Sequence, residues 1–194
     1  NETTREQWNS MMFQVGRSNL MQSWSYGEAK SKIEGWKVSR IVIWKLNKPV
    51  AFVQILEKQF AFLRLVRINR GPLLLEDSHP EMQEDLTQLL VKELGGWKKG
   101  RLLFFTPELP LNGKILALMT NLGLYQPTCR SWESIWFDLA EDRGELRNGL
   151  NGKWRNMLSF AERQKLRLET HYDVQNFEWL VNRCYKMMKD RGES

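Results

Sequence analysis

The chain has 194 residues and a formal net charge of +6, from 29 basic and 23 acidic side chains. With 42% hydrophobic and 27% charged residues, its composition is that of a globular protein, and no apolar run is long enough to cross a membrane. Two cysteines and two histidines exclude a disulfide framework and argue against a structural zinc site, so no metal is expected. No secretory pattern opens the chain, which favours a cytoplasmic location.

The excess positive charge is concentrated in residues 143–167. That segment has seven basic side chains against Glu145 and Glu162, a net of +5, whereas residues 1–142 carry +2 and residues 168–194 carry −1. A local basic patch indicates an anionic partner such as a phosphate, a nucleic acid or a lipid headgroup. A solvated helix face explains the same pattern.

The first part of the chain predicts two helices and then three strands. Helices are expected over residues 1–15 and over Gln22–Ile33. Runs rich in β-branched and aromatic residues predict strands at Trp36–Leu46, Val50–Glu57 and Phe60–Asn69. The turn residues Asn47-Lys48-Pro49 and a short connection at Lys58-Gln59 join these strands into an antiparallel meander.

The second part alternates helices and strands. A helix is expected to begin near His79-Pro80 and to end at Gly95-Gly96, with an apolar stripe at Met82, Leu86, Leu89, Leu90 and Leu94. The continuous apolar run Arg101–Thr106 is typical of a parallel strand covered on both faces. A helix at Gly113–Leu122, a strand at Ser131–Leu139, and helices at 150–165 and 173–191 follow.

This element order predicts an α+β fold: an antiparallel meander followed by α-β-α-β. It is the order of the GNAT-type acyltransferase fold, in which the sheet splays between two central strands and the acyl donor enters the gap. Several other α+β topologies share the order, so the motifs must decide between them.

Three short stretches carry a more specific resemblance. They are Gln22–Lys30 (QSWSYGEAK), Arg67–Leu74 (RINRGPLL), and Lys153–Asn156 (KWRN) with the later Ala161-Glu162 and Leu166–Glu169. Together, in this order and spacing, they resemble the FemABX family of peptidoglycan interpeptide-bridge aminoacyltransferases. The family pattern has a Gly where this sequence has Lys165.

The resemblance implies a chain built from two GNAT-like halves, and it covers about residues 20–190. Family members run roughly twice as long. We therefore expect residues 1–145 to form the first GNAT-like domain, and residues 146–194 to supply a linking basic helix and the opening helix of a second half. A homodimer through residues 146–194 would be one way to complete the fold.

The resemblance also implies site residues. Lys30 matches a lysine that contacts the phosphates of a nucleotide-linked precursor, and Trp24 and Tyr26 would line the groove. Glu108, in the loop after the strand that ends at Thr106, is the candidate acceptor of the proton from an attacking amine. The remaining candidates for phosphate or substrate contact are Arg67, Arg70, Gly71, Thr106, Lys153, Arg155 and Asn156. For each of these the alternative is an ordinary surface, turn or loop residue.

Three functions fit these observations. The first is a FemABX-type transferase that moves an aminoacyl group, from aminoacyl-tRNA, to an amine of a cell-wall or polysaccharide precursor, with no other cofactor, in the cytoplasm or at the inner membrane face. The second is a CoA-dependent GNAT N-acyltransferase, although the Gly-rich pyrophosphate loop of those enzymes is not evident. The third is a non-catalytic GNAT-like half used for binding or dimerisation.

Overall fold

The computed structural model describes residues 3–75, 82–95, 100–109, 113–126, 138–164 and 166–192. The chain divides into two compact units, Asn1–Thr128 and Cys129–Ser194. Each unit is described by itself. The expected strand at Ser131–Leu139 and the expected helix start at His79-Pro80 fall largely or wholly outside the described residues.

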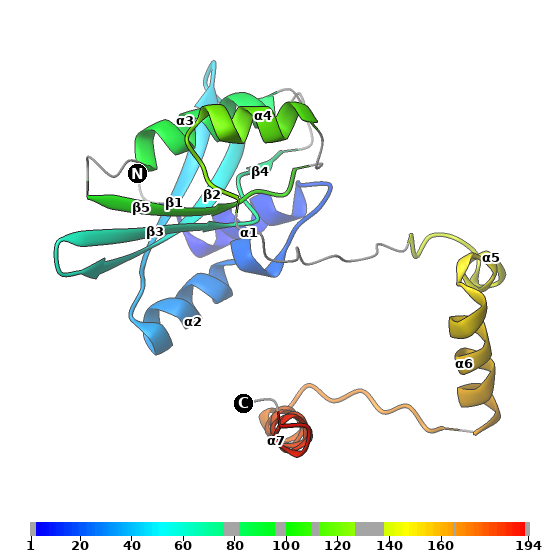
Figure 1. Ribbon diagram of the computed structural model, residues 1–194. Helices are drawn as coiled ribbons and strands as arrows, with labels where there is room; N and C mark the ends of the chain where they lie inside the picture. Colours follow the sequence, from blue (N-terminus) through cyan, green and yellow to red (C-terminus); the bar gives the residue numbers. More distant parts are fainter. Residues whose placement is uncertain are drawn as a thin grey trace. The chain divides into compact units, whose positions relative to one another are not determined.

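The first unit is an α+β structure (Figure 1). Its elements are α1 (Arg5–Phe13), the short 3-10 helix η1 (Leu20–Gln22), α2 (Trp24–Glu34), β1 (Lys37–Lys45), β2 (Lys48–Phe60), β3 (Leu63–Asn69), β4 (Leu73–Leu74), α3 (Met82–Leu94), β5 (Arg101–Thr106) and α4 (Gly113–Asn121). Side-chain oxygens of Thr4, Asn19 and Ser23 accept backbone hydrogen bonds at the starts of α1, η1 and α2, so polar residues fix these three helix starts.

The sheet is mixed, with the order β1-β2-β3-β5 and with β4 beside β2. β1, β2 and β3 pair antiparallel, and β3 pairs parallel with β5 from Arg64–Arg101 to Asn69–Thr106. The α+β class, the meander and the parallel strand expected from the sequence are confirmed. The chain can join β3 to β5 in parallel only because α3 carries it back along the sheet.

Two hydrophobic clusters hold helices to opposite faces of the sheet. On one face, Trp8 of α1 packs against Phe52 of β2, with ring centroids 4.9 Å apart in an edge-on arrangement. On the other face, Val53, Val66 and Leu90 are the centre of a cluster that anchors α3. The alternation of strand side chains places Phe52 and Val53 on opposite faces. The helices α1 and α2 therefore lie on one side of the sheet and α3 on the other.

Two expectations about the strands were wrong. The β2–β3 turn lies at Ala61-Phe62 and not at Lys58-Gln59, because Lys58–Phe60 continue the ladder opposite Leu63–Leu65. β5 is covered on one face only, since Leu102 and Phe104 are exposed while their neighbours are half-buried. A run of apolar residues cannot by itself distinguish a strand buried on both faces from one that displays apolar side chains to solvent.

The described residues of the second unit form the helices α5 (Arg143–Gly149), α6 (Gly152–Arg163) and α7 (Val174–Asp190). Asp142, Asn151 and Asp173 cap their N-termini through side-chain oxygens. The helices expected at 150–165 and 173–191 are thus present, whereas α5 was not expected. Within the described residues, none of the helices is both long and apolar enough to span a membrane.

Candidate substrate-binding site

The first two sequence motifs lie against each other in the first unit. Gln22, at the end of η1, is fully buried, and its side chain bonds to two strands. Its Nε2 donates to the carbonyl oxygen of Asn69 at 2.7 Å, and its Oε1 accepts from the backbone N–H of Gln54 at 2.7 Å. Its own carbonyl accepts from the indole of Trp8 at 2.8 Å. Gln22 thus joins the start of α2 to the end of β3.

Two glycines of these motifs are required by close packing. A Cβ on Gly71 would lie 2.7 Å from Nε2 of Gln22, and a Cβ on Gly27 would lie 2.3 Å from Oε1 of Gln54. Such distances are far inside van der Waals contact, so any side chain at either position forces its neighbour to move. Gly71, a candidate ligand-binding residue, lies buried in this contact.

Trp24 lies under a guanidinium. Arg40 of β1 stacks on its ring, with 3.5 Å between the guanidinium carbon and the ring centroid. The same side chain donates to Oε1 of Gln54 and pairs with Glu28, each at 3.1 Å. Burial lowers the pKa of Arg40, and the hydrogen bond that Arg40 donates to Glu28 opposes that effect. Arg40 therefore covers one face of the Trp24 ring, which was expected to line the groove.

The C-terminal ends of the parallel strands β3 and β5 carry a small charged cluster. Arg70 has a positive φ of 51°, and its N–H donates to the carbonyl oxygen of Thr106 at 2.7 Å. Its guanidinium lies 3.7 Å from Oε1 of Glu108. Nδ2 of Asn19 donates to the carbonyl oxygen of Arg70 at 2.9 Å and lies 3.5 Å from Oε2 of Glu108. The two predicted residues, a cation and a carboxylate, are thus brought together at a strand end.

A row of polar side chains leads from this cluster toward α2. Arg67 donates through Nε to Oδ1 of Asn69 at 2.9 Å, and Nδ2 of Asn69 lies 3.5 Å from the hydroxyl of Tyr26. Lys30 lies 5.6 Å from the centre of the Tyr26 ring and pairs with Glu34 one turn further along α2. This row brings Tyr26 and Lys30 of the first motif beside Arg67 of the second on one side of the sheet.

The strands β3 and β5 do not separate at their ends. Their ladder continues through Asn69 and Thr106, the N–H of Arg70 extends it, and the hydroxyl of Thr106 donates to the carbonyl oxygen of Ile68 at 3.3 Å. The splayed gap that admits the acyl donor in a GNAT fold is absent between these two described strands.

The third motif lies in the second unit, where it joins α5 to α6. Arg147 forms a two-pronged ion pair with Glu162, at 2.9 and 3.0 Å, and donates to the hydroxyl of Ser159. Nη1 of Arg155 donates to the carbonyl oxygen of Asn148 at 2.7 Å. Two positive charges of the basic segment therefore hold the helix pair together. Lys153 and Asn156, the other two candidates from this motif, are exposed on α6.

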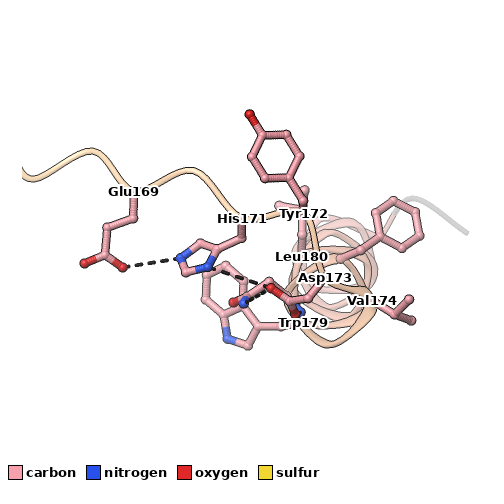
Figure 2. A pocket seen from close by; sticks show the side chains of 9 residues that line it. Glu169, His171, Tyr172, Asp173, Val174, Trp179 and Leu180 are labelled. Atoms are coloured by element: carbon pink, nitrogen blue, oxygen red, sulfur yellow. Dashed lines mark hydrogen bonds and ion pairs between the residues drawn. The ribbon is translucent and has the colours of Figure 1, made fainter.

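A shallow hollow lies at the start of α7 (Figure 2). Figure 2 shows His171 between the carboxylates of Glu169 and Asp173. Its Nε2 lies 3.3 Å from Glu169 and its Nδ1 lies 3.8 Å from Asp173. Asp173 accepts bonds from the N–H and the side chain of Asn176, and these lower its pKa. All three side chains of the His171 cluster are about half exposed to water, and Asp173 serves as the helix cap. We therefore assign this cluster to the helix start rather than to catalysis.

Comparison with known proteins gives a match to a solved structure. The matched protein is FemX, known from a crystal structure. The match covers 63% of this chain and 31% of FemX, with 21% sequence identity and a TM-score of 0.46. The chain therefore spans about a third of the length of FemX. No protein-family model and no curated protein matches the sequence.

Sequence reasoning missed the side chains that organise the site. Asn19, Arg40 and Gln54 each make hydrogen bonds to residues far away in the chain, and none belongs to a recognised motif. One signal was present: Gln54 lies in the middle of the apolar run Val50–Leu56, and a polar residue there must find partners in the core.

Proposed function

We propose that this chain is part of a FemABX-type transferase, one that passes an activated acyl or aminoacyl group to an amine of a cell-wall or polysaccharide precursor. The observation that carries the proposal is the gathering of Lys30, Arg67 and Arg70 from two separate motifs on one side of the sheet. Tyr26 and Asn69 lie between Lys30 and Arg67, and Asn19 holds the backbone of Arg70. Such an arrangement suits a precursor that carries a diphosphate.

In the proposed reaction the amine nitrogen attacks the carbonyl carbon of an ester, with aminoacyl-tRNA as the donor. The ester C–O bond breaks, the amide forms, and the proton lost by the nitrogen ends on the departing ribose hydroxyl. An ester of this kind is already activated, so the protein contributes mainly by holding the reactants in place. Glu108, at the strand ends beside Arg70, is the candidate to carry the proton between the two atoms.

Roles for the other candidates follow from their positions. Gly71 lets the chain pass against Gln22, and Thr106 holds the backbone of Arg70. We propose that Lys153 and Asn156, with the free donors of Arg155, contact phosphates of the precursor or of tRNA from the second unit. Both substrates are cytoplasmic compounds, which favours a reaction in the cytoplasm or at the inner face of the membrane.

The CoA-dependent alternative has less support, because an acyl-CoA needs the gap that the β3–β5 ladder closes. A role in dimerisation has a specific observation in its favour. Trp154, Met157 and Phe160 of α6 are each more than half exposed, as are Phe177 and Leu180 of α7. A second copy pairing through residues 146–194 would cover these side chains.

The test of the main proposal is calorimetric titration of the full chain at low salt with a UDP-linked muropeptide. We expect binding that Arg70→Gln weakens about tenfold or more, since a hydrogen bond to a charged group contributes roughly 1.5–3 kcal/mol. Lys45→Gln, which removes an exposed cation at the end of β1 beside the β1–β2 turn, is the matched control and should leave the affinity unchanged. Equal loss in the two variants would point to general electrostatic attraction and remove the assigned site.

A further inference from the structure

Among the residues that the structure describes, the α2-facing side of the sheet is covered over β1 and β2 and at the end of β3, whereas Leu102 and Phe104 of β5 on that side remain exposed. Trp8 and Phe52 fill the covered half. In the open half, Phe104 and Leu102 of β5 are 51% and 37% exposed, although both are large apolar side chains. Burying these two side chains would remove apolar area from water, so this surface favours contact with an apolar partner.

The strand register shows that these side chains continue to the tip of the β2–β3 hairpin. Leu102 lies beside Leu65, which in turn lies opposite Lys58, and Phe60 lies opposite Leu63 on the same face. Phe62, in the turn, is 85% exposed. We call Phe60, Phe62, Leu65, Leu102 and Phe104 the aromatic strip. In Figure 1 the β2–β3 turn stands clear of α2 and α3.

The strip is bordered by cations. Lys58 and Arg67 lie on its face of the sheet, and Arg64 and Arg101, at the same end of the sheet, lie on the opposite face. Neither the stretch 58–70 nor β5 contains an acidic residue. Lys58 donates to the carbonyl oxygen of Glu34, whose carboxylate pairs with Lys30, and Arg101 donates to the carbonyl oxygen of Glu93. The partner of this surface must therefore be apolar and negatively charged at once.

We propose that the aromatic strip and the hairpin tip dock onto an anionic lipid bilayer. Phenylalanine rings at the tip would enter the boundary between headgroups and acyl chains, while the flanking arginines meet lipid phosphates. The opposite end of the sheet, at Trp44 and Leu46, also exposes apolar side chains, but only Lys45 and Lys48 lie beside them in the sequence. The proposal does not rest on the acyl-transfer reaction.

The experiment is co-sedimentation of the full chain with vesicles of phosphatidylcholine alone or mixed equally with phosphatidylglycerol. We expect binding to the anionic vesicles that falls at high salt. The variant Phe60→Ser/Phe62→Ser should lower the partition coefficient about tenfold or more. Arg64→Gln should lower it about fivefold. The matched control, Trp44→Ser/Leu46→Ser, should bind like the parent.

Several results would overturn the proposal. They are absence of binding, equal binding to neutral vesicles, unchanged binding by the double phenylalanine variant, and loss of binding in the tryptophan control. Sedimentation showing that the strip mediates self-association, or tighter binding to tRNA that the same variant abolishes, would assign the strip to another partner. Circular dichroism checks folding, and Phe62→Ser alone, at a turn position, serves if the double variant does not fold. Titration with the muropeptide is a separate readout that should not change.

Discussion

The side-chain amide of Gln22 occupies the space next to Gly71 that a Cβ would need. The distance from that Cβ to Nε2 of Gln22 would be 2.7 Å. Gln22 cannot move away easily, because it is fully buried and bonded to both Gln54 and Asn69. Gln22 and Gly71, one residue from each of the first two motifs, therefore have a packing role. Their contact sets the path of the chain at Arg70, where it leaves β3.

Gly71→Ala should lower the free energy of unfolding by roughly 2 kcal/mol, as expected for overpacking in a core. The measurement is urea unfolding of the full chain followed by near-UV circular dichroism. Gly16→Ala is the matched control, since a Cβ there meets nothing within 4 Å and should have little effect or stabilise slightly.

A double-mutant cycle sharpens this test. Gln22→Ala alone leaves the N–H of Gln54 without its partner, so it should be destabilising by itself. Combined with Gly71→Ala it removes the clash, and the double variant should lose less than the sum of the two single losses. Strict additivity would show that the two side chains do not compete for space.

Arg70→Gly should separate binding from stability. Arg70 adopts a left-handed φ of 51°, which glycine tolerates without a steric cost. The stability of the variant should therefore stay within about 1 kcal/mol of the parent, while muropeptide affinity falls. Arg67→Gly is the contrast, because Arg67 lies within β3, where glycine destabilises. If Arg70→Gly unfolds as easily as Arg67→Gly, the backbone argument fails.

The β1–β2 turn can be improved. Leu46 and Asn47 both have positive φ, 50° and 62°, as in a two-residue type I′ turn, and leucine is poorly suited to that conformation. Leu46 is almost fully exposed, so its replacement loses no packing. Leu46→Asn should raise the free energy of unfolding by roughly 0.5–1 kcal/mol, read from the thermal midpoint. Leu46→Ala keeps the strain and should give no such gain; equal gains would point to another cause.

Acid should loosen the start of α7. Hydrogen bonds from Asn176 hold the pKa of Asp173 below its usual range. A carboxyl with a lowered folded-state pKa stabilises at pH values above its unfolded pKa, and that contribution is lost as the pH falls through the lowered value. Far-UV circular dichroism of the full chain should show helix loss on acidification that is smaller in Asp173→Asn. Asparagine caps helices without titrating, so identical acid profiles would contradict this role.

The sequence by itself determined the order of most elements. Period-two and period-3.6 patterns, with caps such as Ser23 and Asp173, place helices and strands because they depend on neighbours a few residues away. The sequence did not locate the β2–β3 turn. Lys58-Gln59 has the pattern of a connection between strands, although Lys58–Phe60 pair with β3. The pairing energy of a partner strand decided that register.

The tertiary structure alone decided which motif residues meet. The motif resemblance names Tyr26, Arg67 and Glu108 as candidates, but the parallel β3–β5 pairing and the buried Gln22 bring them to one side of a sheet. The roles of Asn19 and Arg40 could be recognised only in the tertiary structure, since hydrogen bonds to distant residues leave no local sequence pattern. The exposure of Phe104 was likewise decided by the tertiary structure. Its strand is as apolar as a buried strand, and the sequence does not tell which face of it a helix covers.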